Sequence, residues 1–161
     1  MSVEPNPFDD ERLIQIRESQ EDPIVQYYIV RTDVPMTIGK VCAQIAHGAQ
    51  MFAYRFMNLK EQGSLDSKIE LTDKWINGSF RKVVLGGKAK DFERIKKELD
   101  VFLVRDAGLT EVEPGTETVI VTWPLLKSSQ PKFLQRLRVL NVLNTNVLTK
   151  DLQDQKEQNN V

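Results

Sequence analysis

Two kinds of hydrophobic pattern alternate along this chain of 161 residues. Short runs rich in β-branched and aromatic residues are typical of buried strands, and they occur at 25–32, 80–85, 102–106 and 117–123. Longer stretches repeat an apolar residue every three or four positions, which is the period of one helix face. They predict helices over 38–61, around 65–79, over 89–101 and over 131–140.

The longest helical pattern begins at Ile38, ends at Glu61 and is followed by Gly63 and Ser64, which are typical residues at a helix end. Its apolar residues are separated by four, four, three and four positions. They form a stripe that we expect to be buried, made of Val41, Ile45, Ala49, Phe52 and Phe56.

The order of these elements is strand, helix, helix, strand, helix, strand, strand, helix, which is typical of an α/β domain with right-handed crossovers. Gly86 and Gly87 are expected to end the second strand. Pro114 and Gly115 occupy the central positions of a predicted type II turn. We therefore expect the last two strands to pair antiparallel, which makes the sheet mixed.

The length and composition predict one domain that needs no disulfide or metal ion for its stability. Cys42 is the single cysteine and His47 the single histidine, so an internal disulfide and a paired-histidine metal site are excluded and no cofactor is expected. Cys42 itself is expected to be a small buried residue. We find no apolar run of the ~20 residues that a membrane span needs and no signal peptide. The cytoplasm is the expected location.

Charge is distributed unevenly around a net value of −1. Residues 1–24 carry seven acids and two arginines, and residues 151–161 carry three acids and one lysine, which leaves a net charge of +6 on 25–150. We divide the chain into an acidic extension (1–24), a domain (25–140) and a polar tail (141–161). A basic body is compatible with a polyanionic partner, although a merely mixed, soluble surface explains it as well.

One candidate site lies at the start of the long helix. Lys40, Gln44 and His47 share one helix face, more than a quarter-turn from the apolar stripe, so we expect that face to point to solvent. A lysine in the first turn opposes the helix dipole, which suggests that it has a function. The alternative is an ordinary solvated polar face.

A second candidate site surrounds Asp106, which ends a strand where open α/β sheets collect their ligands. Thr110 could orient this carboxylate, and Thr118 returns close to it if the intervening loop forms a hairpin. Alternatively, Asp106 caps its own loop and Thr118 is a threonine selected for β propensity. A third cluster, Lys90, Arg94 and Lys97, suits phosphate contact or an ordinary solvated helix face.

Two of these regions carry sequence motifs. Residues 31–33 (RTD) and 39–47 (GKVCAQIAH) resemble the signature of archaeal and eukaryotic type 2 peptidyl-tRNA hydrolases. Residues 104–118 (VRDAGLTEVEPGTET) match that family's D-A-G-x-T-x-V-x-P-G-[ST]-x-T motif almost without a gap. The resemblance covers about 25–124. It departs from the family at 35–38, at Trp123-Pro124, where the family has Gly-Pro, and over 125–140.

The resemblance implies a mixed four-stranded sheet with helices on both faces, and it allows a homodimer. It also implies metal-free hydrolysis of the ester that joins a peptide to the 3′ end of tRNA, with tRNA as the partner. Carried over by position, the catalytic residues are expected to be Lys40, Asp106, Thr110, Thr118 and His47. The substrate-binding residues are expected to be Gln44, Arg31, Lys90, Arg94 and Lys97.

Such a reaction needs a group that positions water and a group that stabilises the developing oxyanion. Asp106 is the candidate base or water orienter, and Lys40 the candidate stabiliser of the oxyanion or of the terminal phosphate. His47 could instead carry the proton. The alternatives are a catalytically weak tRNA- or protein-binding module on the same fold, and a hydrolase for another ester such as a modified aminoacyl-tRNA.

Overall fold

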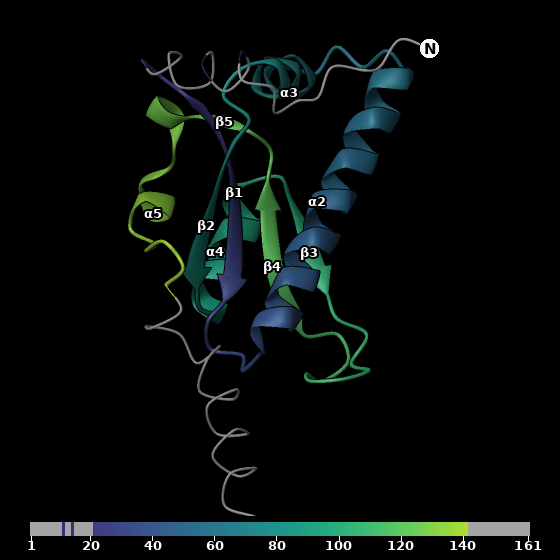
Figure 1. Ribbon diagram of the computed structural model, residues 1–161, viewed down its shortest axis with the longest axis vertical. Coiled ribbons are helices and arrows are strands. Elements are labelled where there is room, and N and C mark those ends of the chain that lie inside the picture. Colours follow the sequence, from purple (N-terminus) through teal and green to yellow (C-terminus); the bar gives the residue numbers. More distant parts are fainter. Residues whose placement is uncertain (1–10, 12–13, 15–20, 142–161) are drawn as a thin grey trace, which may run out of the picture.

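A mixed β-sheet forms the centre of the computed structural model, which describes residues 11, 14 and 21–141 (Figure 1). Its main strands lie in the order β2-β1-β4-β3. Strands β1 and β2 pair parallel, and β4 pairs antiparallel with both β1 and β3. The strands are β1 (Ile24–Arg31), β2 (Arg81–Gly87), β3 (Val101–Arg105), β4 (Glu117–Thr122) and a two-residue β5 (Leu125–Leu126) beside β1. The predicted mixed α/β sheet is confirmed, with β5 as an addition.

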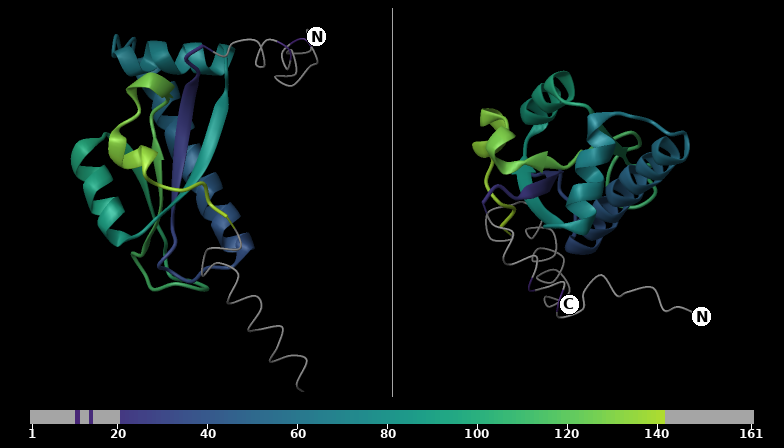
Figure 2. Two further views of the ribbon diagram at one scale, coloured as in Figure 1. Left: turned by 90° about the vertical axis from the view of Figure 1, so that its left-hand side faces the viewer. Right: turned by 90° about the horizontal axis from the view of Figure 1, so that it is seen from above.

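Helices cover both faces of this sheet, as the edge-on view in Figure 2 shows. Alternate residues of β1 enter two different cores, because successive side chains of a strand point to opposite faces. Tyr28 and Val30 pack with α2 (Ile38–Glu61) and α3 (Ser67–Asn77). Val25, Tyr27 and Ile29 pack with α4 (Ala89–Glu98) and with Leu134.

Helix α2 has the predicted bounds, and its N-cap is Thr37, whose hydroxyl accepts a hydrogen bond from the Lys40 backbone N–H at 3.3 Å. The predicted stripe is buried at Val41, Phe52 and Phe56. Gly48 is buried as well, and a Cβ there would clash with the Val121 side chain. The absence of a side chain at Gly48 therefore brings the helix close to β4.

The second strand runs further than expected. It continues through Gly86 and Gly87, where the sequence analysis placed a break. A Cβ at Gly86 would lie 2.8 Å from the Thr32 side chain, and one at Gly87 would lie 2.8 Å from Ile29. These glycines permit close approach of neighbouring groups rather than ending the strand.

The expectation of a last helix over 131–140 is wrong. Helix α5 covers Lys132–Gln135 alone. Beyond it the chain pairs with the free edge of β2: the Gly86 N–H donates to the Arg138 carbonyl at 3.0 Å, and the Leu140 N–H donates to the Val84 carbonyl at 2.9 Å. An unpaired edge strand presents unsatisfied backbone groups, and this segment satisfies them at the expense of helical bonds.

The last residues of the predicted acidic extension are attached to the domain. The Asp22 carboxylate accepts hydrogen bonds from the Ser128 N–H and hydroxyl at 2.8 and 2.6 Å, and the Pro23 carbonyl accepts one from Lys127 at 3.0 Å. Most of the extension and nearly all of the predicted tail lie outside the described residues. None of the described helices is long and apolar enough to span a bilayer.

Candidate active site

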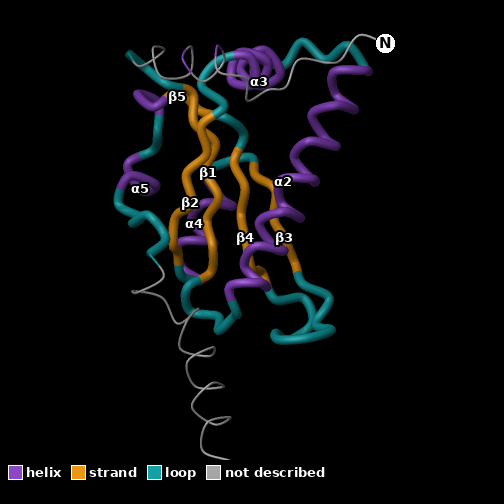
Figure 3. The backbone as a smooth tube through the Cα atoms, viewed as in Figure 1, coloured by secondary structure: helices purple, strands orange, loops and turns teal. Residues whose placement is uncertain are grey.

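The carboxyl ends of β1, β2 and β3 and the first turn of α2 lie at the same edge of the sheet, the lower one in Figure 3. The loop that joins β3 to β4 also lies there. It forms a hairpin, because the Asp106 N–H donates to the Thr116 carbonyl at 2.9 Å and the Gly115 N–H donates to the Asp106 carbonyl at 2.7 Å. This loop places Asp106 against α2.

An ion pair between Lys40 and Asp106 is the centre of the candidate site. Lys40 Nζ lies 2.5 Å from Asp106 Oδ2, and the two side chains are 12% and 7% exposed. The ammonium also donates to Thr110 Oγ1 at 3.2 Å. A positive charge in the first turn is unfavourable to the helix dipole, and the carboxylate beside it offsets that cost.

Gln44 connects this ion pair to Thr118. Its amide Nε2 donates to Asp106 Oδ2 at 2.9 Å, and its Oε1 accepts from the Thr118 hydroxyl at 2.5 Å. The Thr118 hydroxyl also lies 3.4 Å from the Val104 carbonyl. Thr118 thus acts on Asp106 through Gln44 rather than by direct contact.

The expectation that the Lys40/Gln44 face points to solvent is wrong. Gln44 is 3% exposed and Thr118 is fully buried. The reason is that the loop after β3 folds over the first turns of α2, an arrangement that joins residues more than sixty positions apart. The helical periodicity of α2 contains no information about this loop.

The second oxygen of Asp106 caps its own loop, since Oδ1 accepts from the Gly108 N–H at 2.8 Å. Gly108 has a φ of +75°, and a Cβ there would clash with Pro114, so glycine is required. Asp106 therefore caps its own loop through Oδ1, while Oδ2 faces Lys40 and Gln44.

These partners hold the pKa of Asp106 below its ordinary value. The largest cause is the hydrogen bond from Lys40, and the Gly108 N–H and Gln44 add to it against the opposing effect of burial. Hydrogen bonds and a positive charge favour the ionised form. Asp106 is therefore a carboxylate at neutral pH.

Glu111, which was not among the candidate residues predicted from the sequence, holds the start of α2. Its two oxygens accept hydrogen bonds from the Thr37 N–H at 2.8 Å and from the Thr37 hydroxyl at 2.6 Å. An acid at a helix N-terminus satisfies unpaired N–H groups and complements the dipole. Glu111 lies within the same motif as Asp106 and Thr110, which was the available signal. It fixes the loop against the start of α2.

His47 lies on the exposed part of α2. The hydrogen bonds that join Lys40, Gln44, Asp106, Thr110 and Thr118 do not include it. Cys42 is also exposed, contrary to the expectation that it is buried. The described part of the chain holds no group of three His, Cys, Asp or Glu side chains arranged to bind a metal ion.

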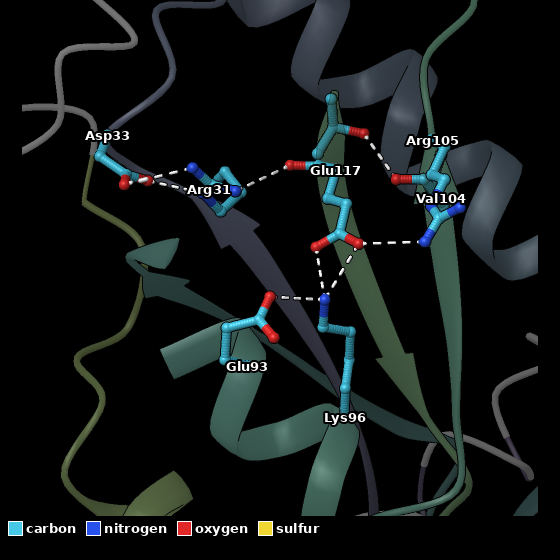
Figure 4. A network of polar contacts seen from close by, with 8 residues as sticks. Arg31, Asp33, Glu93, Lys96, Val104, Arg105 and Glu117 are labelled. Carbon is cyan, nitrogen blue, oxygen red and sulfur yellow. Dashed lines mark hydrogen bonds and ion pairs between the residues drawn. The ribbon is translucent and has the colours of Figure 1, made fainter. Parts of the chain in front are cut away.

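Arg31 interacts mainly with other parts of the domain (Figure 4). Its guanidinium donates to both oxygens of Asp33 at 2.6 and 3.2 Å and lies 5.3 Å from the centre of the Phe92 ring. Beside it, Lys96 lies 2.8 Å from Glu117 and 2.6 Å from Glu93. This network connects α4 to β1 and β4.

The remaining predicted binding residues lie on α4, and all are exposed. Arg94 pairs with Glu98 at 2.8 Å and lies 4.9 Å from the centre of the Phe133 ring. Lys90 and Arg94 face a groove that is shared with the segment after α5, whereas Lys97 is not among the residues that line it.

Comparison with known proteins places these features in a family. The family model described as peptidyl-tRNA hydrolase PTH2 matches residues 24–140. Peptidyl-tRNA hydrolases of Methanopyrus kandleri and Staphylothermus marinus are 39% and 36% identical to this chain over 107 and 104 residues. Each alignment covers 62% of this chain, and 83% and 80% of the respective relative.

A probable peptidyl-tRNA hydrolase 2 of Dictyostelium discoideum is 29% identical over 120 residues, which is 71% of this chain and 53% of that protein. The family model spans every residue of the Lys40–Asp106 cluster and the whole described sheet. The chain therefore belongs to the peptidyl-tRNA hydrolase PTH2 family.

Proposed function

We propose that this protein hydrolyses the ester bond between a peptide and the 3′ end of tRNA, and that the Lys40–Asp106 pair is its reaction centre. The observation that carries the proposal is the ion pair at the carboxyl edge of the sheet, 2.5 Å long and held by Gln44 and Thr110. It is built from the residues of the two motifs that this chain shares with the family. Membership of the family supplies the substrate.

Lys40 is proposed to stabilise the negative charge that develops during the reaction. Attack of water on the ester carbonyl places negative charge on the carbonyl oxygen, and a fixed positive charge nearby lowers the energy of that state. The ammonium of Lys40 is held by Asp106 and Thr110, so little reorganisation is needed when the oxyanion forms. The same charge suits the terminal phosphate of the tRNA.

Asp106 is proposed to orient the attacking water and to anchor Lys40. A general base works best when its pKa is near the working pH, and the pKa of Asp106 is lowered by Lys40, Gly108 and Gln44. Its carboxylate is therefore a good hydrogen-bond acceptor for water but a weak base. His47, the alternative proton carrier, lies outside the hydrogen-bonded cluster, so we place it second.

The other predicted residues take supporting roles. Thr110 holds the Lys40 ammonium, and Thr118 fixes the orientation of the Gln44 amide, which in turn holds Asp106. Arg31, Lys90, Arg94 and Lys97 are proposed to contact phosphates of the tRNA. The cytoplasm as location and a homodimer as assembly remain predictions from the sequence.

The test is a peptide-release assay on purified protein with N-acetyl-aminoacyl-tRNA. Asp106→Asn keeps the shape of the side chain but removes its charge, so we expect turnover to fall by about 100-fold or more while the protein still binds tRNA. The control is Asp73→Asn, which breaks the exposed Lys60–Asp73 pair, also 2.5 Å long, and should turn over like the wild type.

Wild-type turnover by a folded Asp106→Asn variant would remove Asp106 from the reaction and make His47 the next residue to test. A wild-type protein that binds peptidyl-tRNA without releasing the peptide would favour the catalytically weak binding module. Release from modified aminoacyl-tRNA alone would favour the other ester hydrolase.

A further inference from the structure

A basic groove lies beside the outer strand β2, on the opposite side of the sheet from β3 and Asp106. It measures about 800 Å³ and runs between α4 and the segment after α5. Gly86 and Gly87 of the edge strand β2 contribute to it, whereas Asp106 follows β3 at the opposite edge. The groove and the Lys40–Asp106 cluster are therefore two separate sites on one domain.

The charge of this groove is strongly one-sided. Among the described residues, its lining includes a single carboxylate, Asp91, and that group is already engaged because its Oδ2 accepts the Lys88 N–H at 2.8 Å. Within residues 21–141, Arg94 is the one basic residue of the lining that forms an ion pair. The basic residues of the lining are Lys88, Lys90, Arg94, Arg136 and Arg138.

The backbone that carries these charges is well fixed. The Arg138 carbonyl accepts the Gly86 N–H, and the next residue but one, Leu140, donates to Val84. On the other wall, the Arg94 guanidinium lies against the Phe133 ring. Ile95, fully buried, and the partly buried Leu137 give the groove an apolar floor.

We propose that this groove binds the sugar–phosphate backbone of the tRNA body while the peptidyl ester lies at Lys40; this inference rests on the proposed function. Guanidinium groups bind phosphate oxygens in pairs, and several such contacts along one groove suit a polymer of phosphates. The ring of Phe133 and the stacked Arg94 offer a surface for ribose or an unpaired base. A ligand with one phosphate would leave most of these charges unused.

The groove also refines the choice of binding residues. Lys90 and Arg94 belong to it and Lys97 does not, while Lys88, Arg136 and Arg138 join them. Of the five basic residues that line the groove, helical spacing on α4 identifies Lys90 and Arg94 alone. Arg136 and Arg138 reach the groove because residues 138–140 pair with β2 instead of continuing a helix.

The test compares two double variants of the full-length protein. Arg136→Gln/Arg138→Gln removes two exposed charges from the groove. Arg55→Gln/Lys132→Gln removes two exposed charges that do not line it. For full-length peptidyl-tRNA, we expect the KM of the groove variant to rise about 5- to 50-fold while kcat stays unchanged. The plot of log(kcat/KM) against log[salt] should also become less steep, its slope decreasing in magnitude by roughly 1.5. The control should keep the wild-type KM and slope.

A short substrate locates the effect. A peptidyl ester on an oligonucleotide that ends in CCA has no stem to reach the groove, so both variants should cleave it at the wild-type kcat/KM. A groove variant that matches the control on full-length peptidyl-tRNA overturns the inference but leaves the proposed function intact. A groove variant that loses the short substrate as well also overturns it, because the defect then lies at Lys40.

A measurement of tRNA binding tests the groove independently of the proposed hydrolysis. If the wild-type protein releases no peptide, the proposed function fails, and fluorescence anisotropy with uncharged tRNA tests the groove alone. A loss of affinity confined to the groove variant supports the groove. Equal affinities for the groove variant and the control overturn it.

Discussion

At the scale of single residues, the proposed reaction depends on a pair of opposite charges with little access to water. Asp106 is 8% exposed as a residue and accepts four hydrogen bonds or charge contacts at its carboxylate and backbone from Lys40, Gln44, Gly108 and Gly115. A charge in such a place needs partners. We therefore expect removal of either member of the pair to change stability as well as activity.

Lys40→Met keeps the aliphatic stem but leaves the Asp106 carboxylate without its cation. We expect a loss of about 1–3 kcal/mol in the free energy of unfolding, below the cost of breaking a fully buried pair because the site lies at the sheet edge. Urea denaturation measures it. Lys60→Met, which breaks an exposed pair, should cost about 0–1 kcal/mol. Equal effects of the two variants would contradict the burial argument.

The pH dependence of stability gives a second test of the pair. The pKa of Asp106 in the folded protein lies below its unfolded value of about 3.9. Asp106 therefore stabilises the fold above pH 3.9, and this contribution disappears as the pH falls through the lower folded pKa. In urea titrations between about pH 2.5 and 6, Asp106→Asn should lose less stability on acidification than the wild type. Identical slopes would show that the ion pair is not formed in solution.

At the scale of elements, the site depends on how one loop attaches to one helix. The loop between β3 and β4 contacts the start of α2 through Asp106, Thr110 and Glu111. Gly108 and Gly115, both with positive φ, give the loop the turns that let these three side chains reach the same helix end.

Glu111→Gln tests this attachment without touching the ion pair. The amide retains one acceptor for Thr37 but loses the negative charge at the helix N-terminus, so we expect about 0.5–2 kcal/mol of destabilisation and a several-fold lower kcat. Hydrogen exchange at the first turn of α2 should quicken. Glu113→Gln, an exposed residue of the same loop, is the matched control. A Glu111→Gln protein with the properties of this control would show that the contact with Thr37 is dispensable.

At the scale of the whole molecule, a basic domain is joined to acidic ends. Residues 1–20 carry five acids and two arginines, whereas Asp22 and Pro23 are hydrogen-bonded to 127–128. Asp22 and Pro23, which the composition assigns to the extension, are therefore attached to the domain.

Deletion of 1–20 removes five of the seven acidic residues of 1–24 and retains these contacts. We expect an unchanged Tm and a tRNA affinity increased about 2- to 5-fold at low salt, with the difference disappearing as salt rises. Deletion of 1–24 also removes Asp22, Pro23 and the first residue of β1, so its Tm should fall by several degrees. Differential scanning fluorimetry and anisotropy with labelled tRNA measure the two effects. An affinity that does not respond to the shorter deletion would contradict the electrostatic argument.

The sequence by itself determined the types and order of the elements apart from β5 and the end of the predicted last helix, and it determined the antiparallel pair β3–β4. It did so because periods of two and of three to four residues are properties of neighbouring positions. The motifs likewise selected Lys40, Asp106, Thr110 and Thr118, which the structure brings into one cluster together with Gln44.

Only the tertiary structure decided which side chains are buried and which segments pair. Gln44 became a buried link, His47 stayed outside the cluster, and Glu111 was fixed to Thr37 by contacts over more than sixty positions. The segment 138–140 left its helical pattern because the edge of β2 offered unpaired backbone groups. Those partners lie far away in the sequence, so no local pattern encodes them, and the groove they create exists only once the sheet has formed.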